Sequence, residues 1–230
     1  MNMRPLIGIT TSVNSRDYEV SNQSVVMLPS NYPSAVKDAG GIPLLLSECD
    51  DVDELLDCLD GLVISGGRDI NPNLYGEIPH KKTVDFSDTQ DKWEKSLIEG
   101  AIDREIPLLC ICRGHQLLCV IRGGKLYQDL PTTKGYEKHG ATGGEWSDHV
   151  VKIEKNSLTS KLIGDEIIGN SGHHQGVHDA GDLRVVGRSL DGLIEAVELH
   201  EYPFLISTQW HPEMLKQNSI FEGLIQASLQ

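Results

Sequence analysis

The sequence predicts an α/β fold in which a mostly parallel central sheet is flanked by helices, with short antiparallel strands in the C-terminal third. Before that third, short and very apolar runs alternate with amphipathic helical patterns, which is typical of a parallel sheet covered on both faces. The last third instead carries short strand patterns with close turns, such as Asp191-Gly192, and these favour antiparallel pairing. Since no repeat, low-complexity tract or linker divides the 230 residues, we expect a single domain over 1–230.

The earlier part of the chain supplies four apolar runs that we predict to be strands, at 6–11, 42–46, 61–64 and 106–111. Helical patterns lie between and after them, at 32–39, 52–59, 93–104 and 114–122. Gly40-Gly41 and Gly123-Gly124 follow two of these helices, where the missing side chains suit a helix C-terminus. Residues 68–90 carry no convincing periodicity, and a loop of that length in a compact domain is usually functional or mobile.

A second irregular stretch, 131–148, separates these elements from the antiparallel part. The strands predicted there are short and apolar, at 149–154, 183–187, 193–199 and 204–209. A last helix, predicted at 219–228, closes the chain.

Composition and charge argue against several classes of protein. A hydrophobic content of 39% supplies a full core, whereas a net charge of −14 repels phosphate backbones and anionic lipid. We therefore expect neither a nucleic-acid nor a membrane partner. No run approaches the roughly 20 apolar residues that span a bilayer, and five cysteines without disulfide-rich spacing indicate free thiols. We expect a cytoplasmic protein, with a homodimer as the base-rate oligomeric state.

Cys112 is the candidate nucleophile. A predicted strand ends at this residue, and a helix with an apolar face begins directly after Arg113. At the positive end of a helix, unpaired backbone N–H groups favour the thiolate, which is a competent nucleophile near neutral pH. Two alternatives stay open. Cys112 can be one more small apolar core residue, and Cys110, which strand alternation puts on the same face, competes for the role.

A proton-transfer partner for this thiol is found far along the chain. His211 follows a predicted strand, at the sheet edge where α/β enzymes build their sites. Glu213 lies two residues further on, and its carboxylate can orient the imidazole. The turn 65–67 also follows a strand, and its backbone N–H groups, with that of Arg113, can form an oxyanion hole. Together these features predict cleavage of an amide bond by Cys112.

The histidine-rich run 170–176 offers a different chemistry. His173, His174 and His178 suggest a metal site, but neither HExxH nor CxxC accompanies them, so we predict no metal. The chain also lacks a GxSxG elbow, a GxGxxG fingerprint and a phosphate-binding P-loop. A serine hydrolase, a dinucleotide enzyme and an NTPase therefore have no support, and we expect no cofactor.

Several separate motifs, in the same order, resemble the class I glutamine amidotransferase-like superfamily and within it the γ-glutamyl-γ-aminobutyrate hydrolases (peptidase C26). They are GITTS, AGGIPLLL, DGLVISGGRDINPNLYGE, PLLCICRGHQ, GGKLYQDL, NSGHHQGV and QWHPE. The resemblance spans nearly the whole chain. It implies a flavodoxin-like three-layer sandwich that hydrolyses a γ-glutamyl amide through a thioester, without a cofactor.

The resemblance also implies the residues of the site. They are a catalytic triad of Cys112, His211 and Glu213, an oxyanion hole at the N–H groups of Gly67 and Arg113, and substrate-binding side chains of Gln116, His174 and Gln175. Two positions depart from the family pattern. Cys110 stands where the family has glycine, which leaves the effect on activity open, and Gln90 replaces the arginine of an RD..E pattern at Asp91 and Glu94.

The expected partner is a small γ-glutamyl substrate, and two rival functions remain. One is a glutaminase subunit or domain that supplies ammonia to a synthetase, which shares the elbow and the triad. The other is an inactive domain that binds γ-glutamyl metabolites. The SxHHQ-type run and the LYGE segment favour a stand-alone hydrolase, as the resemblance implies. The sequence leaves open the released amine, with aminobutyrate and the polyamines of polyamine catabolism as candidates, and the loop 68–90 is expected to select it.

Overall fold

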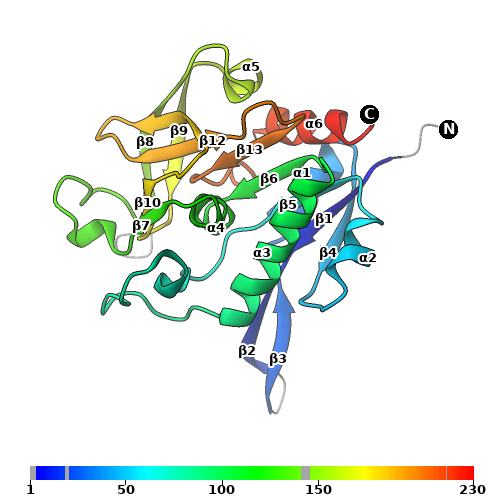
Figure 1. Ribbon diagram of the computed structural model, residues 1–230, viewed down its shortest axis with the longest axis horizontal. Coiled ribbons are helices and arrows are strands. Elements are labelled where there is room, and N and C mark those ends of the chain that lie inside the picture. Colours follow the sequence, from blue (N-terminus) through cyan, green and yellow to red (C-terminus); the bar gives the residue numbers. More distant parts are fainter. Residues whose placement is uncertain (1–3, 19–20, 141–145, 216) are drawn as a thin grey trace.

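A mixed sheet organises the protein (Figure 1), whose structure, a computed structural model, describes residues 4–18, 21–140, 146–215 and 217–230. Five strands at one side are parallel, in the order β4 (Ile42–Leu46), β1 (Leu6–Thr10), β5 (Gly61–Ile64), β6 (Leu108–Ile111) and β13 (Leu205–Thr208). Antiparallel strands continue the sheet as β12 (Ile194–Glu198), β11 (Arg184–Ser189), β8 (Ser147–Ile153) and β9 (Glu166–Ser171). The predicted α/β class, with its antiparallel strands late in the chain, is confirmed.

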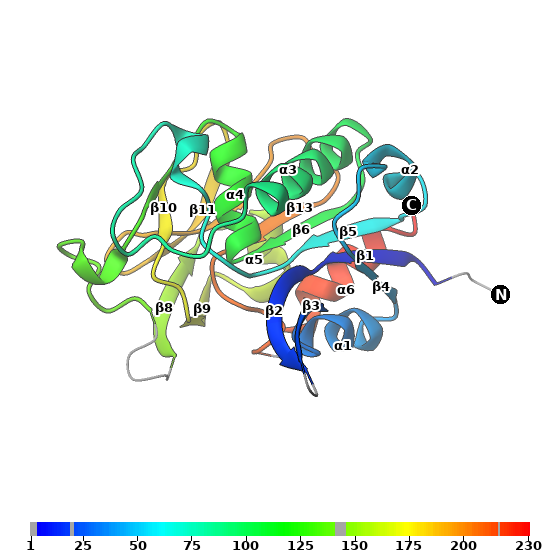
Figure 2. The ribbon, with the colours of Figure 1, turned by 90° about the horizontal axis from the view of Figure 1, so that it is seen from below.

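Helices cover both faces of the parallel strands (Figure 2). One layer holds α1 (Asn31–Asp38) and α6 (Asn218–Ala227), and the other holds α2 (Val52–Leu56), α3 (Asp88–Asp103) and α4 (Arg113–Ile121). Successive residues of β6 alternate between the two cores, since Leu108 and Cys110 pack on the α3–α4 side and Leu109 and Ile111 on the α1–α6 side. A strand that is buried on both faces reads as a continuous apolar run, which is why β6 is visible in the sequence.

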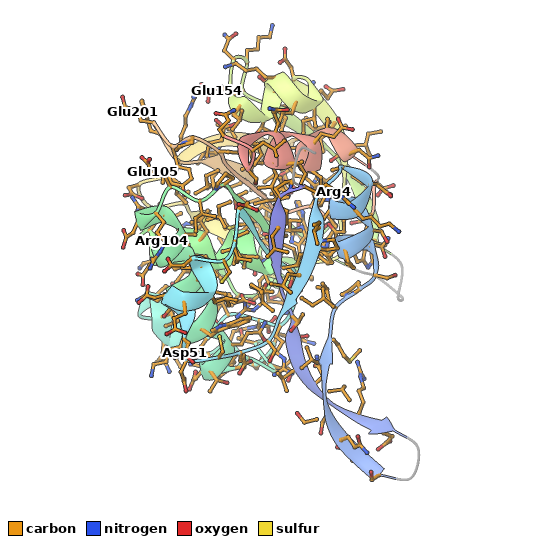
Figure 3. The ribbon with its side chains drawn as sticks, turned by 90° about the vertical axis from the view of Figure 1, so that its right-hand side faces the viewer. Arg4, Asp51, Arg104, Glu105, Glu154 and Glu201 are labelled. Carbon is orange, nitrogen blue, oxygen red and sulfur yellow. The ribbon has the colours of Figure 1, made fainter. Side chains whose placement is uncertain are left out.

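A hairpin that the sequence did not predict projects from this body (Figure 3). It pairs β2 (Ser12–Tyr18) with β3 (Ser21–Met27) in a separate two-stranded sheet. Most of its described side chains are exposed or only partly buried, so the strands carry no apolar alternation from which they could be recognised.

Other small elements were also missed: β7 (Lys125–Tyr127), α5 (Leu158–Ile163) and β10 (Gly176–Asp179), as well as the edge strand β9. Two short 3₁₀ helices, Pro72–Tyr75 and Leu130–Thr132, lie in or beside the stretches predicted to be irregular. Helix α3 begins five residues before its predicted start, because the Ser87 side chain caps it by accepting a hydrogen bond from the Gln90 N–H at 3.3 Å. No helix in the described ranges combines the length and apolar character that a membrane crossing requires.

Candidate active site

Cys112 occupies the turn between β6 and α4 in an unusual backbone conformation. Its φ of 52° and ψ of −102° lie outside the regions that non-glycine residues normally adopt, at a cost of about 1–3 kcal/mol. The turn is tight because α4 packs directly on β5. A Cβ at Gly114 would lie 2.5 Å from the Ile64 carbonyl oxygen, so glycine is required for this close approach. The thiol-bearing residue is thereby held at the N-terminus of α4.

The two neighbouring cysteines do not share a face, and that prediction was wrong. Cys110 belongs to the core under α3 and α4, whereas Cys112 packs with the opposite core. Strand alternation ends where the backbone turns to positive φ, and this turn rotates Cys112 away. Burial, followed by the charges of Cys119 and Glu94, raises the pKa of Cys110 well above its ordinary value. Cys110 is therefore a neutral core thiol.

His211 is fixed in place by a carboxylate and an amide. Its Nδ1 lies 2.6 Å from Oε1 of Glu213, which is buried. The Asn170 side chain accepts a hydrogen bond from the His211 N–H at 2.8 Å and donates one to the His211 carbonyl at 3.3 Å. Since both the ring and the backbone are held, the imidazole has one orientation relative to the turn at Cys112.

The ring of His211 and the candidate nucleophile, Cys112, both lie next to Gly66. A Cβ placed on Gly66 would lie 2.7 Å from His211 Cε1 and 3.5 Å from Cys112 Cβ. Burial lowers the pKa of His211, but the interactions with Cys112 and Glu213 outweigh it and raise the pKa to about 10. A thiolate beside a protonated imidazole is the charge state that a cysteine nucleophile requires.

Tyr32 also contacts this group, and no sequence pattern predicts it. Its hydroxyl accepts a hydrogen bond from the Gly66 N–H at 2.9 Å and lies 3.3 Å from His211 Nδ1. Burial, followed by the charges of Glu213 and Cys112, raises the pKa of Tyr32 well above its ordinary value. The phenol thus stays neutral and keeps its proton for donation.

Two backbone N–H groups beside the thiol are available to a ligand. Tyr32 already occupies the N–H of Gly66. Within the described part of the chain, no acceptor engages the N–H groups of Gly67 and Arg113. These are the groups that were predicted to bind an oxyanion, and they lie at the N-terminus of α4 and in the turn after β5.

The Arg113 side chain points away from the thiol, into a buried ion-pair cluster. Its guanidinium contacts Asp91 at 2.5 Å and also Glu94. Gln90, which replaces the arginine of the family pattern, donates a hydrogen bond to Glu94 at 3.1 Å. Burial raises the pKa of Glu94, although Arg113 and Gln90 oppose this rise. The departure at Gln90 therefore leaves a donor in place, and the cluster anchors the residue that follows Cys112.

The three predicted substrate-binding side chains contact other parts of the protein. Gln116 donates hydrogen bonds to the Gln175 carbonyl at 3.0 Å and to Gln209 at 3.1 Å. The Gln175 side-chain oxygen accepts the N–H of Ile70 at 3.2 Å. His174 lies between Asp69, at 2.8 Å, and a second carboxylate, that of Asp129 at 3.2 Å. Gln175 and His174 thus tie the β9–β10 connection to the loop 68–90, and a role in substrate binding stays a prediction.

An aromatic side chain not predicted from the sequence covers His211. The Trp146 ring centroid lies 4.9 Å from that of His211, and the residue is 42% exposed. A Cβ on Gly172 would lie 2.5 Å from Trp146 Cε2, so the indole lies directly on the β9–β10 connection. Trp146 therefore forms part of the boundary between the imidazole and solvent.

The chain is similar to known proteins over nearly its whole length. The Peptidase C26 family model matches residues 5–213. Protein NtpR of Enterococcus hirae is 36% identical over 239 residues, which cover 99% of each chain. The gamma-glutamyl-gamma-aminobutyrate hydrolase PuuD of Escherichia coli strain K12 is 32% identical over 242 residues, covering 97% of this chain and 93% of that protein. A chain in the structure of PurLQS from Thermotoga maritima has the same fold, with a TM-score of 0.65, 16% identity, and coverage of 99% of this chain and 98% of that one.

Proposed function

The chain belongs to the peptidase C26 family, and from that premise we propose that it is a cysteine-dependent hydrolase of γ-glutamyl amide bonds. Its substrate would be a γ-glutamyl-amine such as γ-glutamyl-γ-aminobutyrate, the compound for which the Escherichia coli relative is named. One observation carries the proposal. Cys112 lies at a strained turn beside an imidazole that a buried carboxylate holds by its other nitrogen.

The first half of the reaction forms a thioester. The Cys112 sulfur attacks the γ-carbonyl carbon, and the carbonyl oxygen takes the negative charge and accepts the N–H groups of Gly67 and Arg113. The His211 imidazolium then gives its proton to the amine nitrogen, the carbon–nitrogen bond breaks, and the free amine leaves. Glu213 stabilises the imidazolium through Nδ1, at 2.6 Å.

The second half releases glutamate. Neutral His211 takes a proton from a water molecule, whose oxygen attacks the thioester carbon. The carbon–sulfur bond breaks, the sulfur leaves as the thiolate, and the new carboxyl group completes glutamate. His211 is again protonated and Cys112 is again a thiolate, so the cycle needs no external oxidant, reductant or cofactor.

A substrate panel tests the proposal. Purified protein is incubated with γ-glutamyl-γ-aminobutyrate, γ-glutamyl polyamines, free glutamine and an α-glutamyl peptide, and released glutamate is measured by mass spectrometry. We expect release from γ-glutamyl amines but not from the α-linked peptide, and loss of release in Cys112→Ser but not in Cys110→Ser. Preference for free glutamine would support an ammonia-supplying glutaminase instead. Absence of release from every compound, with slow alkylation of Cys112 by iodoacetamide, would support a binding domain.

A further inference from the structure

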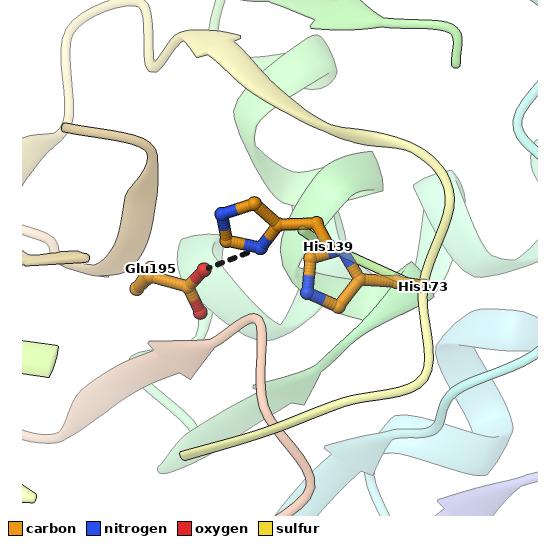
Figure 4. Close-up of side chains that lie close together, drawn as sticks. All are labelled: His139, His173 and Glu195. Atoms are coloured by element: carbon orange, nitrogen blue, oxygen red, sulfur yellow. Dashed lines mark ion pairs between the residues drawn. The ribbon is translucent and has the colours of Figure 1, made fainter. Parts of the chain in front are cut away.

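A second cluster of ionisable side chains lies outside the proposed triad (Figure 4). His139, His173 and Glu195 are each at most 5% exposed. One nitrogen or oxygen atom from each lies within 4.8 Å of the corresponding atoms of the other two. His139 precedes β8, His173 lies in the β9–β10 connection, and Glu195 is in β12, so three separate segments meet here.

Glu195 has no hydrogen bonds to satisfy its charge. Its exposure is 0%, and neither carboxylate oxygen has a hydrogen-bond partner among the described residues. His149 Nε2 lies 3.1 Å from Oε1 but is not aligned as a hydrogen-bond donor, and His139 Nδ1 lies at 3.8 Å. A buried carboxylate without hydrogen bonds is strongly destabilising unless a proton or a cation, such as a protonated His149 or a metal ion, compensates its charge.

The two imidazoles are held so that each turns a ring nitrogen toward Glu195 (Figure 4). His139 Nε2 lies 2.9 Å from Asp191 Oδ2, and His173 Nδ1 lies 2.8 Å from the Gln175 carbonyl oxygen. His139 Nε2 and His173 Nδ1, the outer nitrogens, donate these hydrogen bonds. The inner nitrogens, His139 Nδ1 and His173 Nε2, therefore each keep a lone pair. Outer hydrogen bonds of this kind fix the tautomer and orientation of metal-binding histidines.

The inner nitrogens themselves have little else to bind. His139 Nδ1 has no hydrogen-bond partner among the described residues. His173 Nε2 lies 3.0 Å from the Ser171 hydroxyl, whose oxygen also accepts the Gly140 N–H at 3.1 Å. That hydroxyl proton can rotate away when a cation approaches the nitrogen. Two lone pairs and a carboxylate therefore converge on one small region, and such a group is stable only around a positive charge.

We propose that His139, His173 and Glu195 bind a divalent transition-metal ion, with Zn²⁺ as the best fit. Two imidazole nitrogens and a carboxylate form an established zinc ligand set, with ligand distances of about 2.0–2.2 Å, so tetrahedral ligand atoms stand about 3.4 Å apart. The 3.8 Å between His139 Nδ1 and Glu195 Oε1 is close to this spacing. A small contraction of the cluster completes the site.

The role of this ion is structural. Three protein ligands leave a fourth position for a water molecule, but all three side chains are at most 5% exposed, so a substrate has little access to the ion. The ion joins a loop, the β9–β10 connection and β12. Strand β9 also carries Asn170, which holds the backbone of His211. Metal binding therefore stabilises the antiparallel strands that support the proposed active site.

Zinc titration of the full chain tests this inference without any assay of hydrolysis. The protein is stripped with a chelator, reloaded with ZnCl₂ in competition with a chromophoric chelator, and the bound metal is measured by mass spectrometry. We expect one zinc ion per chain, at least tenfold weaker binding in Glu195→Gln and in His139→Asn, and a zinc-dependent rise in Tm that both variants lose. The Co²⁺-loaded protein should show no thiolate charge-transfer band.

The exposed thiols Cys49 and Cys58 provide the matched control, because surface cysteines also bind zinc. A Cys49→Ser/Cys58→Ser variant should bind zinc like the wild type. Loss of zinc in this variant, a thiolate band in the cobalt spectrum, or unchanged binding in a folded Glu195→Gln variant would each overturn the proposal. Wild-type protein that binds no zinc would overturn it too, leaving a protonated His149 as the partner of Glu195.

Discussion

Replacement of Glu213 by glutamine should move the activity of this protein to lower pH and slow it. The rise of the His211 pKa from 6.5 to about 10 corresponds to about 5 kcal/mol in favour of the protonated ring. Unit charges about 4 Å apart contribute roughly 4 kcal/mol at an effective dielectric constant near 20. The raised pKa keeps the proton on the ring until the pH climbs toward 10. Cys112, the larger cause of the rise, stays in the variant, so removing the Glu213 charge should shift the alkaline limb downward by only part of the rise, at most about three pH units.

The measurement has two parts. The pH profile of kcat/KM for glutamate release should show the shifted limb, together with a fall of roughly 10²- to 10⁴-fold in kcat. Alkylation of Cys112 by iodoacetamide, followed by peptide mass spectrometry, reports the same ion pair without substrate. Glu222→Gln, on the exposed side of α6, removes one charge elsewhere and should match the wild type. If Glu213→Gln keeps the wild-type profile in both assays, Glu213 does not stabilise the His211 imidazolium.

Three further predictions address the thiol, the ion-pair cluster and the tyrosine. Cys112→Ser should abolish glutamate release, while Cys110→Ser retains it, because only Cys112 stands at the turn. The reverse result would show that Cys110 is the nucleophile. Arg113→Met leaves two buried carboxylates without their cation and should lower the free energy of unfolding by about 3–5 kcal/mol in urea titrations. An unchanged free energy of unfolding would mean that the ion pairs contribute no net stability. Tyr32→Phe leaves the Gly66 N–H without its acceptor and should cost about 1–3 kcal/mol in the same titration, with a lower kcat; unchanged stability would mean that water replaces the hydroxyl.

Buried strands of the parallel half could be predicted closely from the sequence. Their side chains are apolar on both faces, so β1, β5 and β6 stand out as continuous runs. The edge strand β4 has an equally apolar sequence, although Ile42, Leu44 and Leu45 are exposed. The β2–β3 hairpin and the other edge strand, β9, could not be predicted, because they are exposed and carry no comparable apolar run; Ile168 in β9 is 63% exposed. Capping is a weaker signal than periodicity, which explains why the first turn of α3, set by Ser87, was missed.

The candidate active site was predicted in part for a similar reason. Cys112, His211 and Glu213 each follow or end a recognisable strand, and the carboxyl ends of neighbouring strands meet at one edge of a sheet. Tyr32 comes from the start of α1 and joins the group only through the packing of that helix on β1 and β5. No local pattern marks such a residue.

The zinc site shows why the metal ligands could not be recognised from spacing. His173, His174 and His178 are close in sequence but diverge in the structure, and only His173 reaches the cluster. Its partners come from 34 and 22 residues away along the chain, at His139 and Glu195. The backbone carbonyl of Glu195 accepts a hydrogen bond from the Gln209 N–H at 2.7 Å. His173 follows the paired strand β9, whereas His139 lies in a segment of turns. Contraction around an ion must therefore come mainly from the His139 segment, because Glu195 is held by a sheet hydrogen bond and His173 lies only two residues after the paired strand β9.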